Sequence, residues 1–196
     1  MRKEKGFVLK PSLNAVSPLN GYSKTFASIK LSEVTELAIV SITFSLNETS
    51  SFKEAFSKYY GNSLPEYGSS TLSKDSTFRF MSMQPGMIFA IYEYVGLEPI
   101  SVLTSQLGAT AFFSDQSDSS FILRLSGKNL HKILERVCAP DLSNKPFPPN
   151  SVARTTVDHL NAIILHEKNN NFLFISPRSS ARSFLNALET SIENTL

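Results

Sequence analysis

Apolar side chains recur at helical spacing in several stretches of the chain. One apolar helix face is predicted by the i, i+3, i+4, i+7, i+8 spacing of Phe52, Ala55, Phe56, Tyr59 and Tyr60. Thr49 or Ser50 is suited to cap its first turn, and Gly61 to end it. The same spacing predicts further helices: one opened by Glu98-Pro99 and ended by Gly108, one that buries Leu130, Ile133, Leu134 and Val137 and ends at Pro140, and one that begins at Ser179 or Ser180 and buries Phe184, Leu185, Leu188 and Ile192.

Runs of β-branched and aromatic residues between these stretches predict strands. Residues 36–46 have the composition of a strand that is buried on both faces. Residues 77–83 and 87–92 flank Gln84-Pro85-Gly86, where proline pre-sets a turn and glycine permits positive φ, so we expect a hairpin. Residues 62–75 are polar and rich in Ser and Gly, which predicts a loop. Other strands are expected at residues 110–113, 121–125, 152–157, 162–165 and 172–175.

The order of these elements predicts an α+β fold. It comprises two successive split βαβ-like halves, with mostly antiparallel sheet and helices packed on one face. We expect one domain at residues 26–196, with halves of approximately 26–115 and 116–196. Strands do not alternate singly with helices, which argues against a doubly wound nucleotide-binding fold.

Residues 1–25 predict an extended N-terminal arm. Their apolar positions follow neither the strand nor the helix period, and Gly6, Pro11, Pro18 and Gly21 interrupt them. An apolar residue every few positions favours burial against another surface, although a frayed terminus is an equally good interpretation. The apolar residues of the arm are Phe7, Leu9, Leu13, Val16 and Leu19.

Composition favours a soluble protein of the cytoplasm. The 196 residues are 41% hydrophobic, enough for a core, and the single Cys138 cannot form an internal disulfide. The formal net charge is only +2, so nucleic acid is not an expected partner. The apolar run Leu37 to Leu46 is too short and too polar to cross a membrane, and Phe7-Val8-Leu9 is too short for an export signal, so neither a membrane nor secretion is expected.

Phosphate-binding motifs are missing from the sequence. It has neither the Gly-x-Gly-x-x-Gly turn of dinucleotide sites nor a phosphate-binding loop ending in Gly-Lys-Ser/Thr. Gly127-Lys128 lies between a predicted strand and a predicted helix, where an anion would bind, but a single glycine is more typical of an ordinary tight turn.

The metal-ligating and nucleophilic side chains are few. His131, His159, His166 and Cys138 are too widely separated to indicate the four convergent ligands of a zinc site. Cys138 lies near the end of an amphipathic helix, where a buried thiol is more typical than a nucleophile.

Charged pairs near predicted turns have simple structural interpretations. Asp115 and Asp118 flank Gln116-Ser117 between two strands, where they are expected to bond backbone amides rather than act as acid and base. Asp158-His159 has no adjacent Ser or Cys nucleophile. Lys168, Arg178 and Arg182 would form either a small basic patch or, more simply, a solvated helix face. We therefore assign no catalytic, cofactor-binding or metal-binding residue.

A succession of short motifs runs through the segment from Ser114 to Ser191. They are Asp115-Gln116-Ser117, Leu123-Arg124-Leu125-Ser126-Gly127, Val137-Cys138-Ala139-Pro140-Asp141-Leu142, Phe147-Pro148-Pro149, Ala153-Arg154-Thr155, Phe172-Leu173-Phe174-Ile175 and Pro177-Arg178-Ser179. In this order they resemble the gamma subunit of heterotetrameric sarcosine oxidase. The likeness is weaker in the first half, where Ser82 to Met87 stands in place of a Trp-bearing Gly-Pro-Asp turn. In the second half, Lys128 stands where that family commonly has a proline.

This resemblance implies a role within a four-chain complex. Gamma chains look like the folate-binding domain of glycine-cleavage aminomethyltransferases, and their complex demethylates sarcosine to glycine, reduces oxygen to hydrogen peroxide and transfers the one-carbon unit to tetrahydrofolate. The resemblance implies that the alpha, beta and delta partners hold FAD, FMN, NAD, tetrahydrofolate and zinc, and that this chain binds none of them.

Two other functions fit the sequence. One is a stand-alone folate binder or one-carbon transferase of the same superfamily, which would need an apolar cavity with a carboxylate for the pterin ring. The other is a scaffold for an unrelated partner. In the leading hypothesis the chain is an accessory subunit whose apolar arm and exposed sheet edges dock on the flavin-bearing beta chain.

Overall fold

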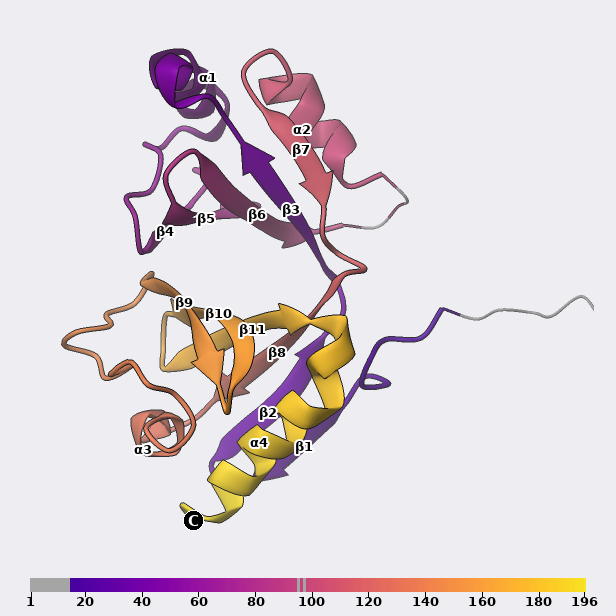
Figure 1. Cartoon of the computed structure of the whole chain (residues 1–196), viewed down its shortest axis with the longest axis vertical. Helices are drawn as coiled ribbons and strands as arrows, with labels where there is room; N and C mark the ends of the chain where they lie inside the picture. Colours follow the sequence, from indigo (N-terminus) through magenta and orange to yellow (C-terminus); the bar gives the residue numbers. More distant parts are fainter. Residues whose placement is uncertain (1–14, 95, 97) are drawn as a thin grey trace, which may run out of the picture.

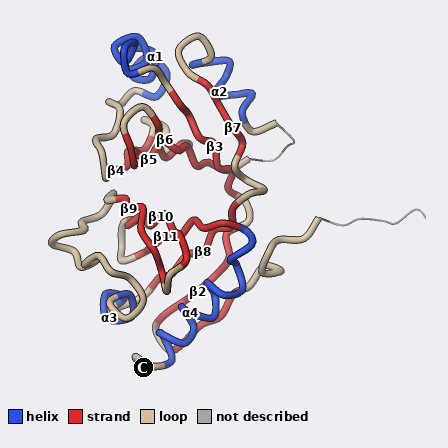
Figure 2. The backbone as a smooth tube through the Cα atoms, viewed as in Figure 1, coloured by secondary structure: helices blue, strands red, loops and turns tan. Residues whose placement is uncertain are grey.

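The computed structural model describes residues 15–94, 96 and 98–196. These residues form two antiparallel sheets that face each other, with helices on the outer faces (Figure 1). Figure 2 shows the strands gathered between a helical layer at the top of the view and another at the bottom. The α+β fold class, with mostly antiparallel sheet, is therefore confirmed.

The six-stranded sheet joins strands from both ends of the described chain. Its order is β1-β2-β8-β11-β10-β9, and every neighbouring pair is antiparallel. The strands are β1 (Ser23–Phe26), β2 (Ile29–Val34), β8 (Ser120–Ser126), β9 (Val152–Val157), β10 (Leu160–Glu167) and β11 (Asn171–Pro177).

The five-stranded sheet is built from the middle of the chain. Its order is β4-β5-β6-β3-β7, again with antiparallel neighbours throughout. The strands are β3 (Leu37–Thr43), β4 (Ser69–Leu72), β5 (Phe78–Gln84), β6 (Met87–Glu93) and β7 (Phe112–Asp115).

The helices cover the outer face of each sheet. Phe52, Phe56 and Tyr60 of the first helix pack on the five-stranded sheet, and Phe184 and Leu188 of the last pack on the six-stranded sheet. The helices are α1 (Thr49–Tyr60) and α2 (Ile100–Leu107) on the first sheet, and α3 (Leu130–Leu134) and α4 (Ala181–Glu193) on the second.

A third apolar cluster fills the space between the two inner faces. Ile39, Met81 and Ile91 of one sheet pack with Leu165 and Leu173 of the other. The cluster has ten buried side chains, each stabilising the fold by roughly 1.5–3 kcal/mol when fully buried. The molecule is thus layered as helix, sheet, sheet and helix.

The two sheets share one strand order. β7-β3-β6-β5-β4 in the first corresponds to β2-β8-β11-β10-β9 in the second. β7 follows β3 to β6 in sequence, whereas its counterpart β2 precedes all the strands with which it shares this order. The chain therefore passes twice between the sheets, from β2 into β3 and from β7 into β8, and these passages run side by side in Figure 1.

The opposite edges of the sheets also meet. Ser69 in β4 and Ser151 beside β9 form an antiparallel bridge. Arg79 in β5 donates through Nη1 to Ser70 Oγ at 3.1 Å and to Asn150 Oδ1 at 3.0 Å. Burial lowers the pKa of Arg79, and the charge of Glu167 opposes that shift. This polar contact closes the side of the sandwich away from the chain passages.

Strand β1 is fastened to the last helix. Tyr22 Oη donates to Glu189 Oε1 at 2.6 Å, and Lys24 Nζ lies 3.1 Å from the same oxygen. The Tyr22 hydrogen bond lowers the pKa of Glu189, while burial raises that of Tyr22. The elements nearest the two ends of the described chain therefore support each other.

Several element predictions are confirmed. The hairpin of β5 and β6 turns at Pro85-Gly86, where Gly86 has φ 75°. Gly61 ends α1 with φ 72°, and its N–H donates to Ser57 O. The strands β8 to β11 each contain their predicted ranges. Glycine and proline mark the hairpin and the end of α1, whereas runs of β-branched and aromatic residues mark β8 to β11.

Other predictions are wrong in place or extent. The predicted loop at residues 62–75 contains β4, the strand predicted at 110–113 lies at β7, and α3 ends at Leu134 instead of reaching Val137. Neither Thr49 nor Ser50 caps α1. Its N-cap is Glu48, and Ser45 instead caps the short 3-10 helix before α1.

The predicted arm at residues 1–25 does not persist to its end. Ser23 to Thr25 belong to β1, where Thr25 pairs with Lys30. Leu19 packs against the core of the six-stranded sheet, whereas the side chain of Val16 is 65% exposed. Phe7, Leu9 and Leu13 lie outside the described residues. β1 and β2 come from the N-terminal part of the chain but lie in the same sheet as β8 to β11. The proposed halves 26–115 and 116–196 therefore do not coincide with the two sheets.

Among the described residues, the structure has no helix long and apolar enough to cross a membrane.

The turn after β8 gives a test of the fold. A Cβ atom at Gly127, where φ is 147°, would lie 2.6 Å from Ser28 O and 3.0 Å from Ile29 Cα. We expect Gly127→Ala to lower the free energy of unfolding by ~2–3 kcal/mol in urea denaturation, because backbone atoms of the β1–β2 turn must move.

Gly21→Ala is the matched control. Gly21 also has positive φ, 68°, but a Cβ atom there meets nothing within 4 Å. It should cost only ~1 kcal/mol, the penalty of the left-handed backbone alone. Equal effects of the two substitutions would contradict the close approach at Gly127.

Candidate functional site

The two chain passages between the sheets lie against each other. Gln116 N–H donates to Ile39 O at 2.8 Å, and Ile39 N–H donates to Ser117 Oγ at 3.0 Å. Asp115 Oδ1 in turn accepts from Ser117 Oγ at 2.6 Å and from Ser117 N–H at 2.9 Å. These bonds fix the position at which β7 gives way to β8, and a cavity opens beside them.

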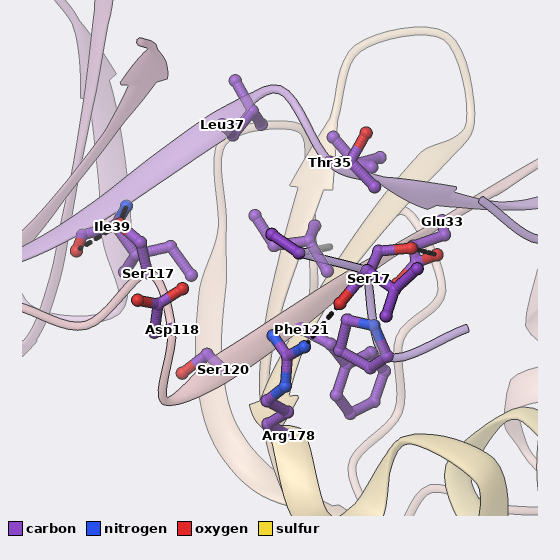
Figure 3. Close-up of a pocket in the computed structure, with 15 residues that line it drawn as sticks. Ser17, Glu33, Thr35, Leu37, Ile39, Ser117, Asp118, Ser120, Phe121 and Arg178 are labelled. Atoms are coloured by element: carbon purple, nitrogen blue, oxygen red, sulfur yellow. Dashed lines mark hydrogen bonds between the residues drawn. The ribbon is translucent and has the colours of Figure 1, made fainter. Parts of the chain in front are cut away.

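This cavity has a volume of about 310 Å³. Its apolar wall comes from Leu37, Ile39 and Phe121, and polar groups of Ser117 and Asp118 lie at one side (Figure 3). Another part of the wall is the segment 15–18 that leads into β1, together with Glu33 and Val34 of β2. The volume is at the lower end of the range for small-ligand pockets, which is roughly 300–1,000 Å³.

The carboxylate of Glu33 is hydrogen-bonded to residues 17–21, which include the end of this segment. Its oxygens accept hydrogen bonds from Ser17 Oγ at 2.7 Å, Leu19 N–H at 3.1 Å and Gly21 N–H at 2.7 Å. Figure 3 shows Ser17 beside Glu33 at one end of the cavity. Glu33 is therefore an anchor for residues 17–21 and not a carboxylate free to bind a ligand.

The predicted basic patch is not assembled. Arg178 Nη2 donates to Val16 O at 2.7 Å, so this guanidinium also holds the segment before β1. Arg178 and Lys168 flank opposite ends of β11, which at about 3.3 Å per residue places them some 20 Å apart. Arg182 is exposed on α4, in agreement with a solvated helix face.

A second cavity, of about 340 Å³, opens at one margin of the seam between the sheets. Phe89, Ile163 and Ile175 supply apolar surface, and the longer polar side chains are those of Gln116, Arg154 and Asn161. Neither Asp nor Glu is among its lining residues. Its chemistry thus suits an anion or an amide better than a cation.

A third cavity, of about 420 Å³, contains internally paired charges. Arg124 Nε lies 3.0 Å from Glu167 Oε2, and both side chains line the cavity together with Arg79. Asp75 also lines it, but Asp75 Oδ1 accepts from Ser73 Oγ and Thr77 N–H, which lower the pKa of Asp75. Arg124 and Glu167 therefore neutralise each other within the chain.

The Gly127-Lys128 segment is a tight turn. Gly127 lets the chain pass close to the β1–β2 turn, and Asn129 at the start of α3 has φ 55° without a capping side-chain bond. Helix α3 spans only Leu130–Leu134, too short for a substantial dipole at its N-terminus. Nothing in this geometry favours phosphate over solvent.

The histidines and the cysteine are dispersed. His131 lies on α3, and His159 forms the β9–β10 turn with Asp158, both at positive φ. Cys138 is 7% exposed, and burial raises the pKa of its thiol to about 12, so it is a core residue and not a nucleophile. Within the described part of the chain, no three His, Cys, Asp or Glu residues gather where a metal ion would fit.

His166 is the buried histidine of this set. Its ring stacks on Phe172 with centroids 4.5 Å apart, and Nδ1 lies 2.7 Å from Phe147 O. Nε2 is buried without a hydrogen-bond partner in the structure. The ring stacking and the Nδ1 contact show that His166 packs against Phe147 of the connector between α3 and β9.

Sequence reasoning missed the residues that organise the passages. Glu33 lies in a strand that was not predicted, although Ile29 and Leu31 alternate with polar residues. Arg79 was not singled out because its partners, Ser70 and Asn150, are distant in sequence. The turn interpretation is confirmed for Asp115, whereas Asp118 accepts no bond from a backbone amide of the described residues and is exposed at the cavity rim.

The anchoring role of Glu33 is testable. Glu33→Gln replaces one acceptor oxygen by a donor and removes the charge, so bonds from Ser17, Leu19 and Gly21 are weakened or lost. We expect the free energy of unfolding to fall by ~1–3 kcal/mol and amide exchange at Leu19 and Gly21 to accelerate.

The control for this substitution is Glu54→Gln on the exposed side of α1. It should leave both measurements close to those of the wild-type chain, since exposed charges contribute little. Unchanged exchange at Leu19 and Gly21 in the Glu33 variant would contradict the anchor.

Comparisons by sequence identify no relative. No family model matches the chain, and no curated protein matches it.

Comparisons of structure do find similar folds. A chain of heterotetrameric sarcosine oxidase from Corynebacterium sp. U-96, in complex with pyrrole 2-carboxylate, is similar with a TM-score of 0.77 and 16% identity, over 92% of this chain and 95% of that one. The glycine cleavage system aminomethyltransferase T from Bartonella henselae is similar with a TM-score of 0.60 and 12% identity, over 89% of this chain. This chain spans 56% of the length of that aminomethyltransferase. The fold is therefore shared with both proteins.

Proposed function

We propose that this chain is a non-catalytic accessory subunit, of the gamma type, in a multi-subunit sarcosine oxidase. The observation that carries the proposal is the similarity to a chain of the Corynebacterium enzyme over nearly the whole length of both chains. A match of 92% and 95% is what two counterparts in one kind of complex would give, whereas the aminomethyltransferase is matched over only part of its length.

The chemistry of the described residues supports this role. Several charged side chains that line the cavities are engaged with the chain itself: Glu33 anchors a segment, Arg79 bonds Asn150, and Arg124 pairs with Glu167. Cys138 and His166 are buried. In such a complex the partner chains would hold FAD, FMN, NAD and zinc and carry out the reaction. Sarcosine, oxygen and tetrahydrofolate would yield glycine, hydrogen peroxide and 5,10-methylenetetrahydrofolate.

Co-expression tests this proposal. When this chain is produced with the alpha, beta and delta sarcosine oxidase chains of the same organism, we expect a yellow complex that contains it in equal proportion. Size-exclusion chromatography with absorbance of the flavin, followed by gel analysis, gives the measurement. If an active flavoprotein of full yield forms without the chain, and the chain elutes alone, the accessory role is wrong.

A stand-alone folate-binding or one-carbon-transfer protein is the second candidate. It is favoured by the fold shared with the aminomethyltransferase and by the cavity beside Phe89 and Arg154. The fit to tetrahydrofolate is incomplete, because a pterin ring presents paired N–H donors that call for a carboxylate, and Asp and Glu are missing from that lining.

Calorimetry separates the two functions. We expect no saturable micromolar binding when tetrahydrofolate is titrated into the isolated chain, with a glycine-cleavage aminomethyltransferase as positive control. Saturable micromolar binding, reduced by Arg154→Gln in the cavity, would favour the second candidate over the first.

A further inference from the structure

Among the described strands, β7 is the sheet edge that has neither a bridge to another edge nor an edge lysine. The edges at β4 and β9 meet through the Ser69–Ser151 bridge. The edge at β1 carries Lys24, whose ammonium is paired with α4, and an edge lysine discourages further pairing. β7 has the sequence Phe-Phe-Ser-Asp, without Lys, Pro or a bulge.

The unpaired backbone groups of β7 can be identified from its register. Gln116 N–H donates to Ile39 O, so in the antiparallel ladder the main-chain groups of Phe112 and Ser114 also face β3. Those of Phe113 and Asp115 therefore face away from the sheet. An extended strand is the chemical partner that satisfies such alternating donors and acceptors.

Phe112 adds an apolar anchor to this edge. Its side chain is 82% exposed, the largest value among the exposed large hydrophobic residues of the described chain. Phe113 packs on the helix side, so Phe112 projects from the opposite face, in the same cross-strand row as Thr43 and Met87. A strand added beside β7 would place a side chain next to Phe112, as in other cross-strand pairs.

The repeated strand order indicates how such a strand would lie. β2 occupies in one sheet the place that β7 occupies in the other, and β1 pairs with the outer edge of β2 in the antiparallel sense. The five-stranded sheet has no counterpart of β1. The vacant place beside β7 thus matches one that this same chain fills in its other sheet.

Charge further defines the occupant. Residues 80–123, which supply β6, α2 and β7, contain Glu93, Glu98, Asp115 and Asp118 but no Lys or Arg, in a chain of net charge +2. Asp115 and Asp118 lie at and just beyond the end of the open edge. A complementary strand would carry basic residues near them.

We infer that β7 is a docking edge for an antiparallel strand of a partner subunit, with an apolar residue beside Phe112 and Lys or Arg near Asp115 and Asp118. This inference rests on the proposed function, because the partner is another chain of the sarcosine oxidase complex. It adds to that function the surface of contact and the chemistry of the strand that meets it.

Binding to the remaining subunits tests the edge. The probe is the complex of alpha, beta and delta chains produced without this chain, immobilised for interferometry. Phe112→Ser removes the anchor, and Ser114→Lys adds an edge lysine that repels a basic strand. Each should weaken binding at least about tenfold, in line with the loss of a central apolar contact or with charge repulsion.

Matched controls change similar residues elsewhere. Tyr67→Ser removes another exposed aromatic side chain, 75% exposed, and Thr25→Lys adds a lysine to the exposed side of the β1 edge. Both should bind as the wild type does. Thermal unfolding of all four variants is expected to stay close to wild type, because each site is exposed.

Hydrogen exchange supplies a second readout. The amides of Phe113 and Asp115 should become protected on binding, and higher salt should weaken the complex. Wild-type affinity in both β7 variants, or unchanged exchange at these amides in the complex, would overturn the docking edge and leave the accessory role intact. Failure of the wild-type chain to bind would refute both. A wild-type dimer that Phe112→Ser converts to monomer would also overturn the inference, since the occupant would then be a second copy.

Discussion

The apolar contact between the inner faces of the two sheets is the constraint on which the rest of the structure depends. Ile39 and Ile91 on one side and Leu165 and Leu173 on the other are almost fully buried. Neither inner face is stable in water without its opposite, so the sheets must form together. The chain passes between them twice, and this path keeps both sheets in register at the passages, while the Arg79–Asn150 contact joins their other edges.

Because side chains fill the seam, open space remains only at its margins. The margins are polar, and two of their charged groups are engaged within the chain: Glu33 with the segment before β1, and Arg124 with Glu167. These contacts stabilise the margins of the seam, whereas Asp118 and Arg154 are exposed there.

Elements with strong local signals could be predicted from the sequence, and those defined by distant contacts could not. Glycine and proline marked the β5–β6 hairpin and the end of α1. β4 escaped notice because Ser69-Ser70-Thr71-Leu72 is polar, and it becomes a strand only through pairing with β5. β1 and β2 lie far in sequence from β8 and α4, which position them. For the same reason the turn role of Asp115 could be predicted from its neighbours, whereas the anchoring role of Glu33 depends on a sheet that the sequence pattern did not show.

The two sheets share the order of five strands, but the six-stranded sheet has one more strand, β1, so the molecule is asymmetric. In the six-stranded sheet, β1 covers the outer edge of β2, and Tyr22 and Lys24 tie β1 to Glu189 of α4. The five-stranded sheet ends at β7, whose counterpart is β2, so the corresponding edge there stays uncovered. Backbone polar groups at an edge are satisfied either by water or by another strand, and an exposed phenylalanine favours the second. β1 therefore joins the two ends of the described chain through its contacts with α4, and β7, from the middle of the chain, is the edge best suited to contact another protein.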